Sequence, residues 1–135
     1  MARMELHLHT EYSNLRLIDS INKHESVIER AISLGLCGVS FSDHECLSGS
    51  VEIDKLREKY QKTHPDFKIA CGNEIYLVDE RGPGQRYWHF LLTAKDAIGH
   101  KQLRELSSIA WLNSYYDRGM ERVPTLKEDL KRIIS

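Results

Sequence analysis

The stretch Glu5-Leu-His-Leu-His-Thr10 decides how the chain is expected to fold. Polar and apolar residues alternate along it, which is typical of a β-strand. Side chains two positions apart on a strand point to the same face, so His7 and His9 can approach one metal ion together. Imidazole nitrogens suit zinc, manganese and iron. Taken alone, such a pair also fits the polar face of an edge strand.

Strand and helix signals alternate from this stretch onward. Strands are expected at 5–10, 38–43, 67–78 and 87–93, a loop at 79–85, and helices at 22–35, from Ser48 or Ser50 to Tyr60, around 103–110 and at 125–134. Capping-box patterns at Asn22 and Thr125 mark two of the helix starts. The order β-α-β-α-β-β-α-α favours an α/β fold with a largely parallel sheet and helical crossovers. Four strands are too few to close a barrel.

Length and composition are those of one ordinary globular domain. The 135 residues are 41% hydrophobic and 29% charged, with a formal net charge of −1, which argues against a nucleic-acid module held by a basic surface. No apolar run approaches the roughly 18–20 residues that cross a bilayer, and no signal-peptide pattern is visible, so a cytoplasmic protein is expected. Three cysteines without a CxxC pair predict neither a disulfide framework nor a zinc knuckle.

Each of the four predicted strands carries at least one possible metal ligand. Asp43 and His44 end the second strand, Glu74 lies in the third, and His89 lies near the start of the fourth. Groups at the carboxyl ends of neighbouring strands converge on one cleft in α/β folds. Asp43 could instead fix the tautomer of a ligand histidine. A carboxylate such as Glu74 among imidazoles is the usual bridge between two metals, and such pairs activate water for attack on phosphate.

The other histidines are assigned no ligand role. His24 lies in a first helical turn, His64 precedes a proline in a loop, and His100 lies on an amphipathic helix, so each is expected to be solvated or structural. Gly82-Pro-Gly84 lacks the strand-to-helix context of a phosphate loop.

Several motifs resemble those of the PHP (polymerase and histidinol phosphatase) superfamily, and more narrowly the start of bacterial or phage-type DNA polymerase III alpha subunits. The stretches that carry the resemblance are His7-Leu-His-Thr-Glu-Tyr-Ser13, Asn22-Lys23, Gly38-Val-Ser-Phe-Ser-Asp-His44, Cys71-Gly-Asn-Glu-Ile-Tyr76 and His89-Phe-Leu-Leu-Thr-Ala-Lys95. The last of these is typical of the polymerase branch. Together they cover nearly the whole chain.

The resemblance implies a distorted, seven-stranded, TIM-like (β/α) barrel that holds up to three divalent ions, zinc, manganese or iron, at its strand ends. Residues 1–135 would form the amino-terminal portion, about the first four strands with their helices. His7, His9, His44, Glu74 and His89 fall on ligand positions. The family's aspartate after the first motif is replaced by Arg16, and a short insertion brings Asp19 into that role. The family's later cysteine or histidine and its Asp-x-His pair have no counterpart here.

The leading hypothesis is therefore a fragment of a replicative DNA polymerase whose site hydrolyses phosphoesters, with 3′–5′ exonuclease proofreading as the expected activity. Glu74, His9 and Asp43 are the expected catalytic residues, and the fragment alone is expected to be inactive. DNA, reached through the longer protein, and other replisome subunits are the expected partners. The unpaired edges of a partial barrel predict self-association. The alternatives are a free-standing phosphatase acting on a small phosphomonoester and a non-catalytic scaffold.

Overall fold

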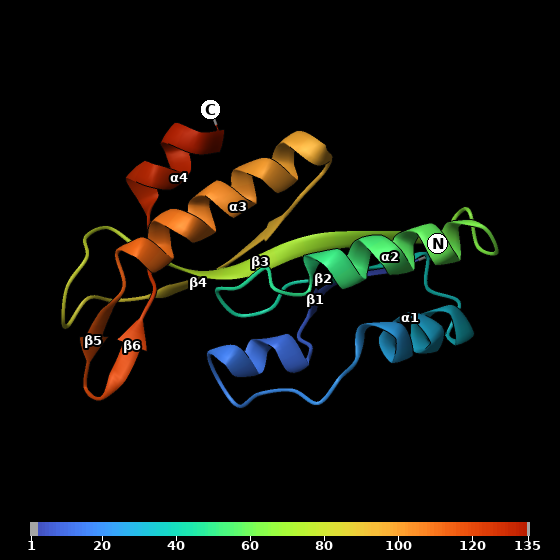
Figure 1. The fold of residues 1–135 in the computed structure, drawn as a ribbon, viewed down its shortest axis with the longest axis horizontal. Helices are drawn as coiled ribbons and strands as arrows, with labels where there is room; N and C mark the ends of the chain where they lie inside the picture. The colour runs from blue at the N-terminus through green and yellow to red at the C-terminus, as the bar shows by residue number, and fades with distance from the viewer. Residues whose placement is uncertain (1–2, 135) are drawn as a thin grey trace.

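The long strand β3 (Lys68–Val78) organises the sheet of the computed structural model, which describes residues 3–134 (Figure 1). Strands β1 (Met4–Leu8) and β2 (Gly38–Phe41) precede it in a parallel array ordered β1-β2-β3. Strand β4 (Trp88–Thr93) pairs antiparallel with β3, and the short β7 (Thr125–Leu126) pairs parallel with its end. The α/β class and the largely parallel sheet are thus confirmed.

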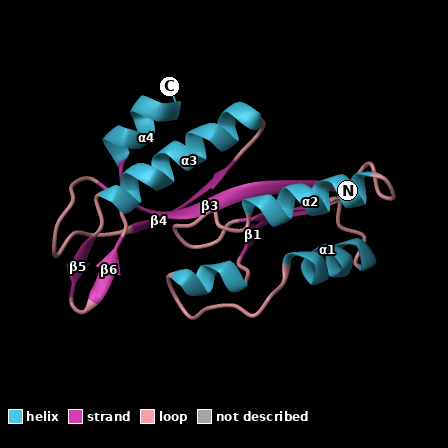
Figure 2. Cartoon of the chain, in the orientation of Figure 1, coloured by secondary structure: helices cyan, strands magenta, loops and turns pink. Residues whose placement is uncertain are grey.

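The helices divide between the two ends of β3. Helices α1 (His24–Ser33) and α2 (Ser50–Gln61) lie at the end that carries β1 and β2, whereas α3 (Ala97–Leu112) and α4 (Lys127–Ile134) lie at the other end (Figure 2). A 3-10 helix, η1 (Glu11–Leu15), follows β1. Strands β5 (Tyr115–Asp117) and β6 (Met120–Arg122) form a small hairpin that lies next to the end of α3 (Figure 2).

The alternation of side chains along β3 separates the hydrophobic core from the polar site. Ile69 and Cys71 pack with α1, α2 and β2 in one core cluster, and Ile75 and Leu77 pack with α3 and α4 in a second one. All four have odd numbers, so they share the face of β3 that the helices cover. Glu74, with an even number, faces the opposite side.

Three local expectations about helix starts were wrong, and for two of them a competing contact is the reason. Asn22 does not cap α1: its side-chain amide donates to the carbonyl of His9, and the cap position is Lys23. Helix α2 follows Gly49, with no side-chain cap. Helix α4 begins at Lys127 rather than Thr125, because Thr125 pairs with β3.

The hairpin β5–β6 was not predicted from the sequence. Its turn contains Arg118 and Gly119, which both have positive φ angles, 51° and 78°. Positive φ at both central positions matches the twist of a two-residue hairpin loop. No helix in the described part of the chain combines the length and apolar character needed to cross a membrane.

Candidate metal centre

The strands β1, β2 and β3 bring their ligand residues to the same edge of the sheet. His7 lies near the end of β1, and His9 follows it. His44 lies three residues beyond β2 and forms an isolated parallel bridge with Glu74. Backbone hydrogen bonds fix that bridge, from the Glu74 amide to the Asp43 carbonyl (3.1 Å) and from the Glu45 amide to the Glu74 carbonyl (2.8 Å). The carboxyl ends of these strands therefore converge as expected.

His89 reaches the same place by a different route. It lies at the start of β4, and the start of a parallel strand would have been at the far edge of the sheet. Because β4 runs antiparallel to β3, His89 lies opposite Tyr76 instead. Its Nδ1 atom makes a short contact with Glu74 Oε1.

Glu74 is the centre of the cluster. Its Oε2 atom lies 2.8 Å from His7 Nε2, 2.6 Å from His9 Nε2 and 3.9 Å from His44 Nδ1. The side chain is only 2% exposed. Burial alone would raise the pKa of Glu74, but hydrogen bonds from the surrounding histidines outweigh it and lower the pKa to about 2. The carboxylate is therefore ionised throughout the physiological range.

Asp19 joins the cluster despite the irregular spacing after Ser13. Its Oδ2 atom lies 2.6 Å from His9 Nδ1 and 3.5 Å from His44 Nε2. Asn14 holds the backbone of this loop, since its side-chain oxygen accepts from the amide of Asp19 and its amide group donates to the carbonyl of Ser20. Asp19 therefore reaches the histidines although Arg16 precedes it where the family has an aspartate.

The predicted ligands form three overlapping groups. These are His7, His9 and Glu74; His9, Asp19 and His44; and His44, Glu74 and His89, with all ligand atoms of a group within 4.8 Å of one another. His9, His44 and Glu74 each belong to two groups. All six residues named as ligands from the sequence are therefore brought together. A shallow cleft of about 360 Å³, lined by His7, His9 and Asp19 among others, opens beside them.

The donor atoms suit divalent metal ions. Imidazole nitrogens and carboxylate oxygens are ligands of zinc, manganese and iron. Burial lowers the pKa of His44, which favours the neutral form that binds metal, although the charge of Glu74 opposes this shift. The Nδ1 atom of His44 is buried and has no hydrogen-bond partner among the described residues. A buried nitrogen without a partner in the middle of the cluster is available to bind a metal ion.

Asp43 is the predicted catalytic residue that the structure does not bring to the cluster. Its Oδ1 atom accepts from the Thr10 amide (2.6 Å) and the Ser13 hydroxyl (2.9 Å), and its Oδ2 atom accepts from the Thr10 hydroxyl (2.9 Å). These bonds leave no histidine for it to orient. The Ser13 hydroxyl also accepts from the His44 amide (3.1 Å). Asp43 therefore ties the segment after β1 to the segment after β2, which is a structural contribution to the site.

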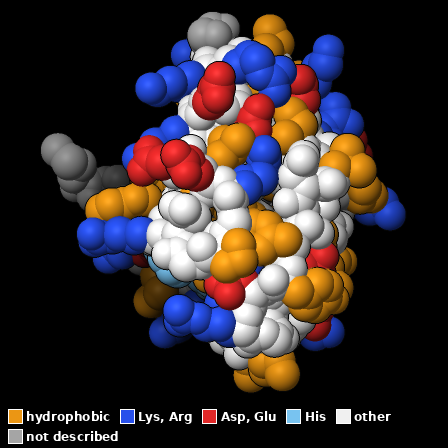
Figure 3. All heavy atoms as spheres, turned by 90° about the vertical axis from the view of Figure 1, so that its left-hand side faces the viewer, with side chains coloured by type: hydrophobic (Ala, Val, Ile, Leu, Met, Phe, Trp, Pro, Cys, Tyr) orange, Lys and Arg blue, Asp and Glu red, His pale blue; other side chains and the backbone are white. Residues whose placement is uncertain are grey.

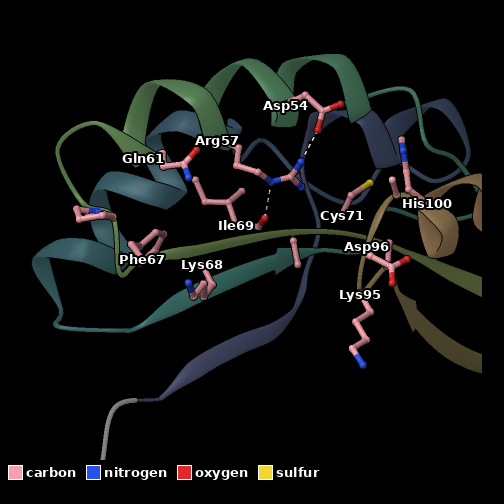
Figure 4. Close-up of a pocket in the computed structure, with 14 residues that line it drawn as sticks. Asp54, Arg57, Gln61, Phe67, Lys68, Ile69, Cys71, Lys95, Asp96 and His100 are labelled. Atoms are coloured by element: carbon pink, nitrogen blue, oxygen red, sulfur yellow. Dashed lines mark hydrogen bonds and ion pairs between the residues drawn. The ribbon is translucent and has the colours of Figure 1, made fainter.

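The remaining histidines lie outside the cluster. His24 is 1% exposed and packs its ring against Phe41, with ring centroids 4.5 Å apart. His64 is exposed and contacts its neighbour Thr63. His100 lines a cleft of about 630 Å³ between α2 and the start of α3, together with Arg57 and Cys71 (Figure 4). This larger cleft lies on the helix-covered side of the sheet.

A buried ion pair beside the cluster could not be identified from the sequence. Arg16 Nε donates to Glu45 Oε2 (2.8 Å), and its Nη2 donates to the carbonyl of Glu121 on β6 (2.6 Å). The guanidinium lies over the ring of Trp111, 5.3 Å from its centroid, and the Trp111 indole donates to the carbonyl of Glu45 (2.8 Å). Glu45 has a positive φ of 50°. These contacts join η1, the segment that carries His44, helix α3 and the hairpin.

Comparison with known proteins shows the family to which the chain belongs. The sequence model of the PHP domain matches residues 5–134, so the chain belongs to the PHP family. A solved structure from Bifidobacterium adolescentis, described as a metal-dependent phosphoesterase, shares the fold with a TM-score of 0.53. It is 22% identical, and the match covers 82% of this chain and 35% of that one.

Within that family, the chain is homologous to the amino-terminal region of DNA polymerase III alpha subunits. It is 41% identical over 140 residues to the Bacillus subtilis protein named Probable DNA polymerase YorL. It is 33% identical over 139 residues to the DNA polymerase III subunit alpha of Helicobacter pylori strain 26695. These matches cover 96% and 99% of this chain, but the chain spans only 11% of the length of each relative.

Proposed function

We propose that this chain carries a divalent-metal cluster for phosphoester hydrolysis, as part of the PHP domain of a DNA polymerase. The observation that supports it best is the set of three ligand groups that share Glu74, His9 and His44. Clusters that share a carboxylate between sites are the usual arrangement for metal-assisted attack of water on phosphate. The family membership and the polymerase relatives support the same proposal.

The residues present fit such ions. The ligands would be the six clustered side chains, and bound ions would supply electrophilic stabilisation of the phosphate and a more acidic water. Glu74, ionised and nearly inaccessible to solvent, offers both oxygens to different groups and can bridge. His9 is held from both sides, by Asp19 on Nδ1 and by Glu74 on Nε2, which fixes its ring orientation. Zinc, manganese and iron are all compatible with these donors.

Metal titration tests this proposal. We expect isothermal titration calorimetry of the chain with Mn²⁺ or Zn²⁺ to show binding that Glu74→Ala weakens by at least about 100-fold. His64→Ala is the matched control, because His64 is an exposed histidine outside the cluster. The proposal fails if wild-type protein binds neither zinc, manganese nor iron, or if both variants lose the same affinity.

The substrate and the setting are taken from the relatives. Since these are DNA polymerases, we propose that the longer protein acts on DNA in the cytoplasm, alongside other replisome subunits, with 3′–5′ exonuclease proofreading as the reaction at the cluster. Assay of that longer protein on a single-stranded oligonucleotide and on 4-nitrophenyl phosphate separates this reaction from a phosphatase. Preference for the monoester would contradict it, and metal binding without either activity would favour a scaffold.

We also propose that the chain on its own associates with further copies. Strand β4 is the last strand of the path β1-β2-β3-β4, and Trp88, Phe90 and Leu91 on it are 39–43% exposed. Unpaired strand edges with apolar side chains promote association. Light scattering at increasing protein concentration should show a rising mean mass. A constant monomer mass would contradict this expectation.

A further inference from the structure

Arg122, on strand β6, forms no salt bridge with a carboxylate among the described residues. It is partly buried, and among the described residues its guanidinium makes no hydrogen bond or ion pair, with Nε shielded from solvent. The other arginines are either paired with carboxylates or exposed; the paired ones are Arg3, Arg16, Arg57, Arg81 and Arg132, and the exposed ones are Arg30, Arg86, Arg104 and Arg118. A partly buried and unpaired guanidinium is costly, which calls for an anionic partner.

Arg122 is close to the metal-ligand cluster. Its guanidinium carbon lies 5.4 Å from the centroid of the Tyr87 ring. The Tyr87 ring lies 5.9 Å from that of Tyr76, which in turn lies 4.7 Å from His89 and 5.8 Å from His44. Arg122 is therefore two aromatic rings away from two predicted ligands, at the rim formed by β4 and the hairpin.

This rim is held in place before any ligand binds. The hydroxyls of Tyr87 and Tyr115 are 2.8 Å apart, and Tyr115 donates to the carbonyl of Gly82 (2.7 Å). Ser114 donates to the carboxylate of Glu121, next to Arg122 (2.7 Å). Arg16 donates to the carbonyl of the same residue. Such contacts at both sides of the hairpin reduce the conformational entropy that binding would otherwise cost.

Two carboxylates close to Arg122, those of Glu45 and Glu121, already have other partners. Glu45 is bound by Arg16, whose Nε donates to Glu45 Oε2 (2.8 Å). Glu121 accepts from Ser114. Figure 3 shows this end of the molecule, where basic, acidic and hydrophobic side chains lie intermixed. Arginine next to an aromatic ring suits a phosphate with its attached nucleoside.

We propose that Arg122, seated on Tyr87, binds a non-reacting phosphate of a nucleotide chain whose scissile phosphate lies at the histidine–carboxylate cluster. This inference rests on the proposed phosphoesterase function and specifies its substrate class. A small phosphomonoester has one phosphate, which the cluster itself would hold. A second phosphate-binding site at a fixed distance from the cluster can contribute to binding only when the substrate carries several phosphates along one chain.

Binding of a fluorescein-labelled thymidine pentanucleotide, followed by anisotropy in the presence of Mn²⁺, tests the proposal. We expect Arg122→Gln to weaken binding by roughly 10-fold or more, the value of a charge-assisted hydrogen-bond pair. The slope of log affinity against log salt should fall by about 0.7, as one phosphate contact is lost. Arg122→Lys, which keeps the charge but not the fork of donors, should lie between wild type and Arg122→Gln.

The matched control is Arg118→Gln at the exposed tip of the same hairpin, expected to change affinity by less than about twofold. Metal titration of each variant separates the proposed metal cluster from the proposed phosphate site. Loss of metal binding in wild type would refute the proposed function. Normal metal binding with no oligonucleotide binding, or with equal losses in Arg122→Gln and Arg118→Gln, would refute the phosphate site alone. Loss of the thermal unfolding transition in both Arg122 variants would assign Arg122 to the fold and also overturn it.

Discussion

The two ends of β3 contribute unequally to the site. The parallel half, made of β1, β2, the first part of β3, α1 and α2, supplies His7, His9, Asp19 and His44, and Glu74 lies just beyond the point where β2 ends. The mixed half, made of the rest of β3, β4, β7, α3 and α4, supplies only His89. The arrangement of the candidate ligands is thus set mainly by parallel strands, whereas the mixed half lies on one side of the cluster and carries the hairpin.

The parallel half also has the larger hydrophobic core. Nine buried residues form the core of the parallel half, and five form that of the mixed half. The halves meet at the Arg16, Glu45 and Trp111 contacts and along β3 itself. We infer that the parallel half is the more rigid support for the metal ligands.

The largest expected effect comes from the parallel core. Phe41 is 1% exposed and lies two residues before Asp43, so Phe41→Ala should cost about 3–5 kcal/mol of unfolding free energy. Leu130→Ala, in the smaller core, should cost about 2 kcal/mol, since α4 is short and lies at the edge of the fold. Urea denaturation followed by circular dichroism measures both. Equal costs would mean that the two cores are equivalent.

The contact between the halves gives the next largest effect. Arg16→Met should cost about 3 kcal/mol at pH 8, because it leaves the buried Glu45 without a counter-ion. Arg3→Met, which breaks an exposed pair with Glu5, should cost at most about 1 kcal/mol.

The cost of Arg16→Met should depend on pH. Burial raises the folded-state pKa of Glu45 from its ordinary 4.5 to about 7, so its contribution to stability is present below pH 4.5 and is lost as pH rises through about 7. Without Arg16 that pKa rises further, and the difference between variant and wild type should grow from pH 5.5 to pH 8. A difference that shrinks over this range would contradict the ion pair as the cause.

Metal affinity distinguishes the halves at the site itself. His9 belongs to two ligand groups and is 18% exposed, whereas His89 belongs to one group and its side chain is 61% exposed. We expect His9→Ala to weaken metal binding by about 100-fold and His89→Ala by about 10-fold. Calorimetric titration with Mn²⁺ provides the comparison. A larger loss in His89→Ala would place the dominant site in the mixed half.

The convergence of the candidate ligands could be predicted from the sequence because they follow regular strand ends. His7 and His9 obey the two-residue period of a strand, and His44 and Glu74 follow from the parallel register. Asp43 was expected at the cluster because it precedes His44, but sequence position does not reveal which way a side chain points. Successive residues of an extended segment point to opposite sides of the chain. The partners of Asp43, Thr10 and Ser13, lie in the segment that follows β1.

The rest of the arrangement depends on contacts between distant residues. Arg16 looks like a defect in the first motif, yet its partners Glu45 and Glu121 lie 29 and 105 positions away. The antiparallel course of β4 likewise depends on the loop that joins it to β3. A local signal did exist for the hairpin, since Arg118-Gly119 between short aromatic and polar stretches fits a two-residue turn.

Thiol reactivity gives the smallest effect and tests how tightly the halves are joined. Cys37 is partly exposed, whereas Cys46 and Cys71 are buried. Burial raises the pKa of Cys46 to about 11 and also raises that of Cys71. At pH 8, we expect Ellman's reagent to modify one thiol per chain promptly, with Cys46 at least about 100-fold slower because little thiolate forms.

Cys71 is the informative residue of the three. It lines the cleft between α2 and α3, where the two halves meet on the helix-covered side of β3 (Figure 4). If the halves move apart on the timescale of labelling, Cys71 becomes accessible and reacts second, well ahead of Cys46. If they stay joined, Cys71 reacts as slowly as Cys46, and both react promptly only when denaturant unfolds the chain. The Cys71→Ser variant identifies which thiol accounts for any second phase, and prompt reaction of all three thiols would contradict the burial of both residues.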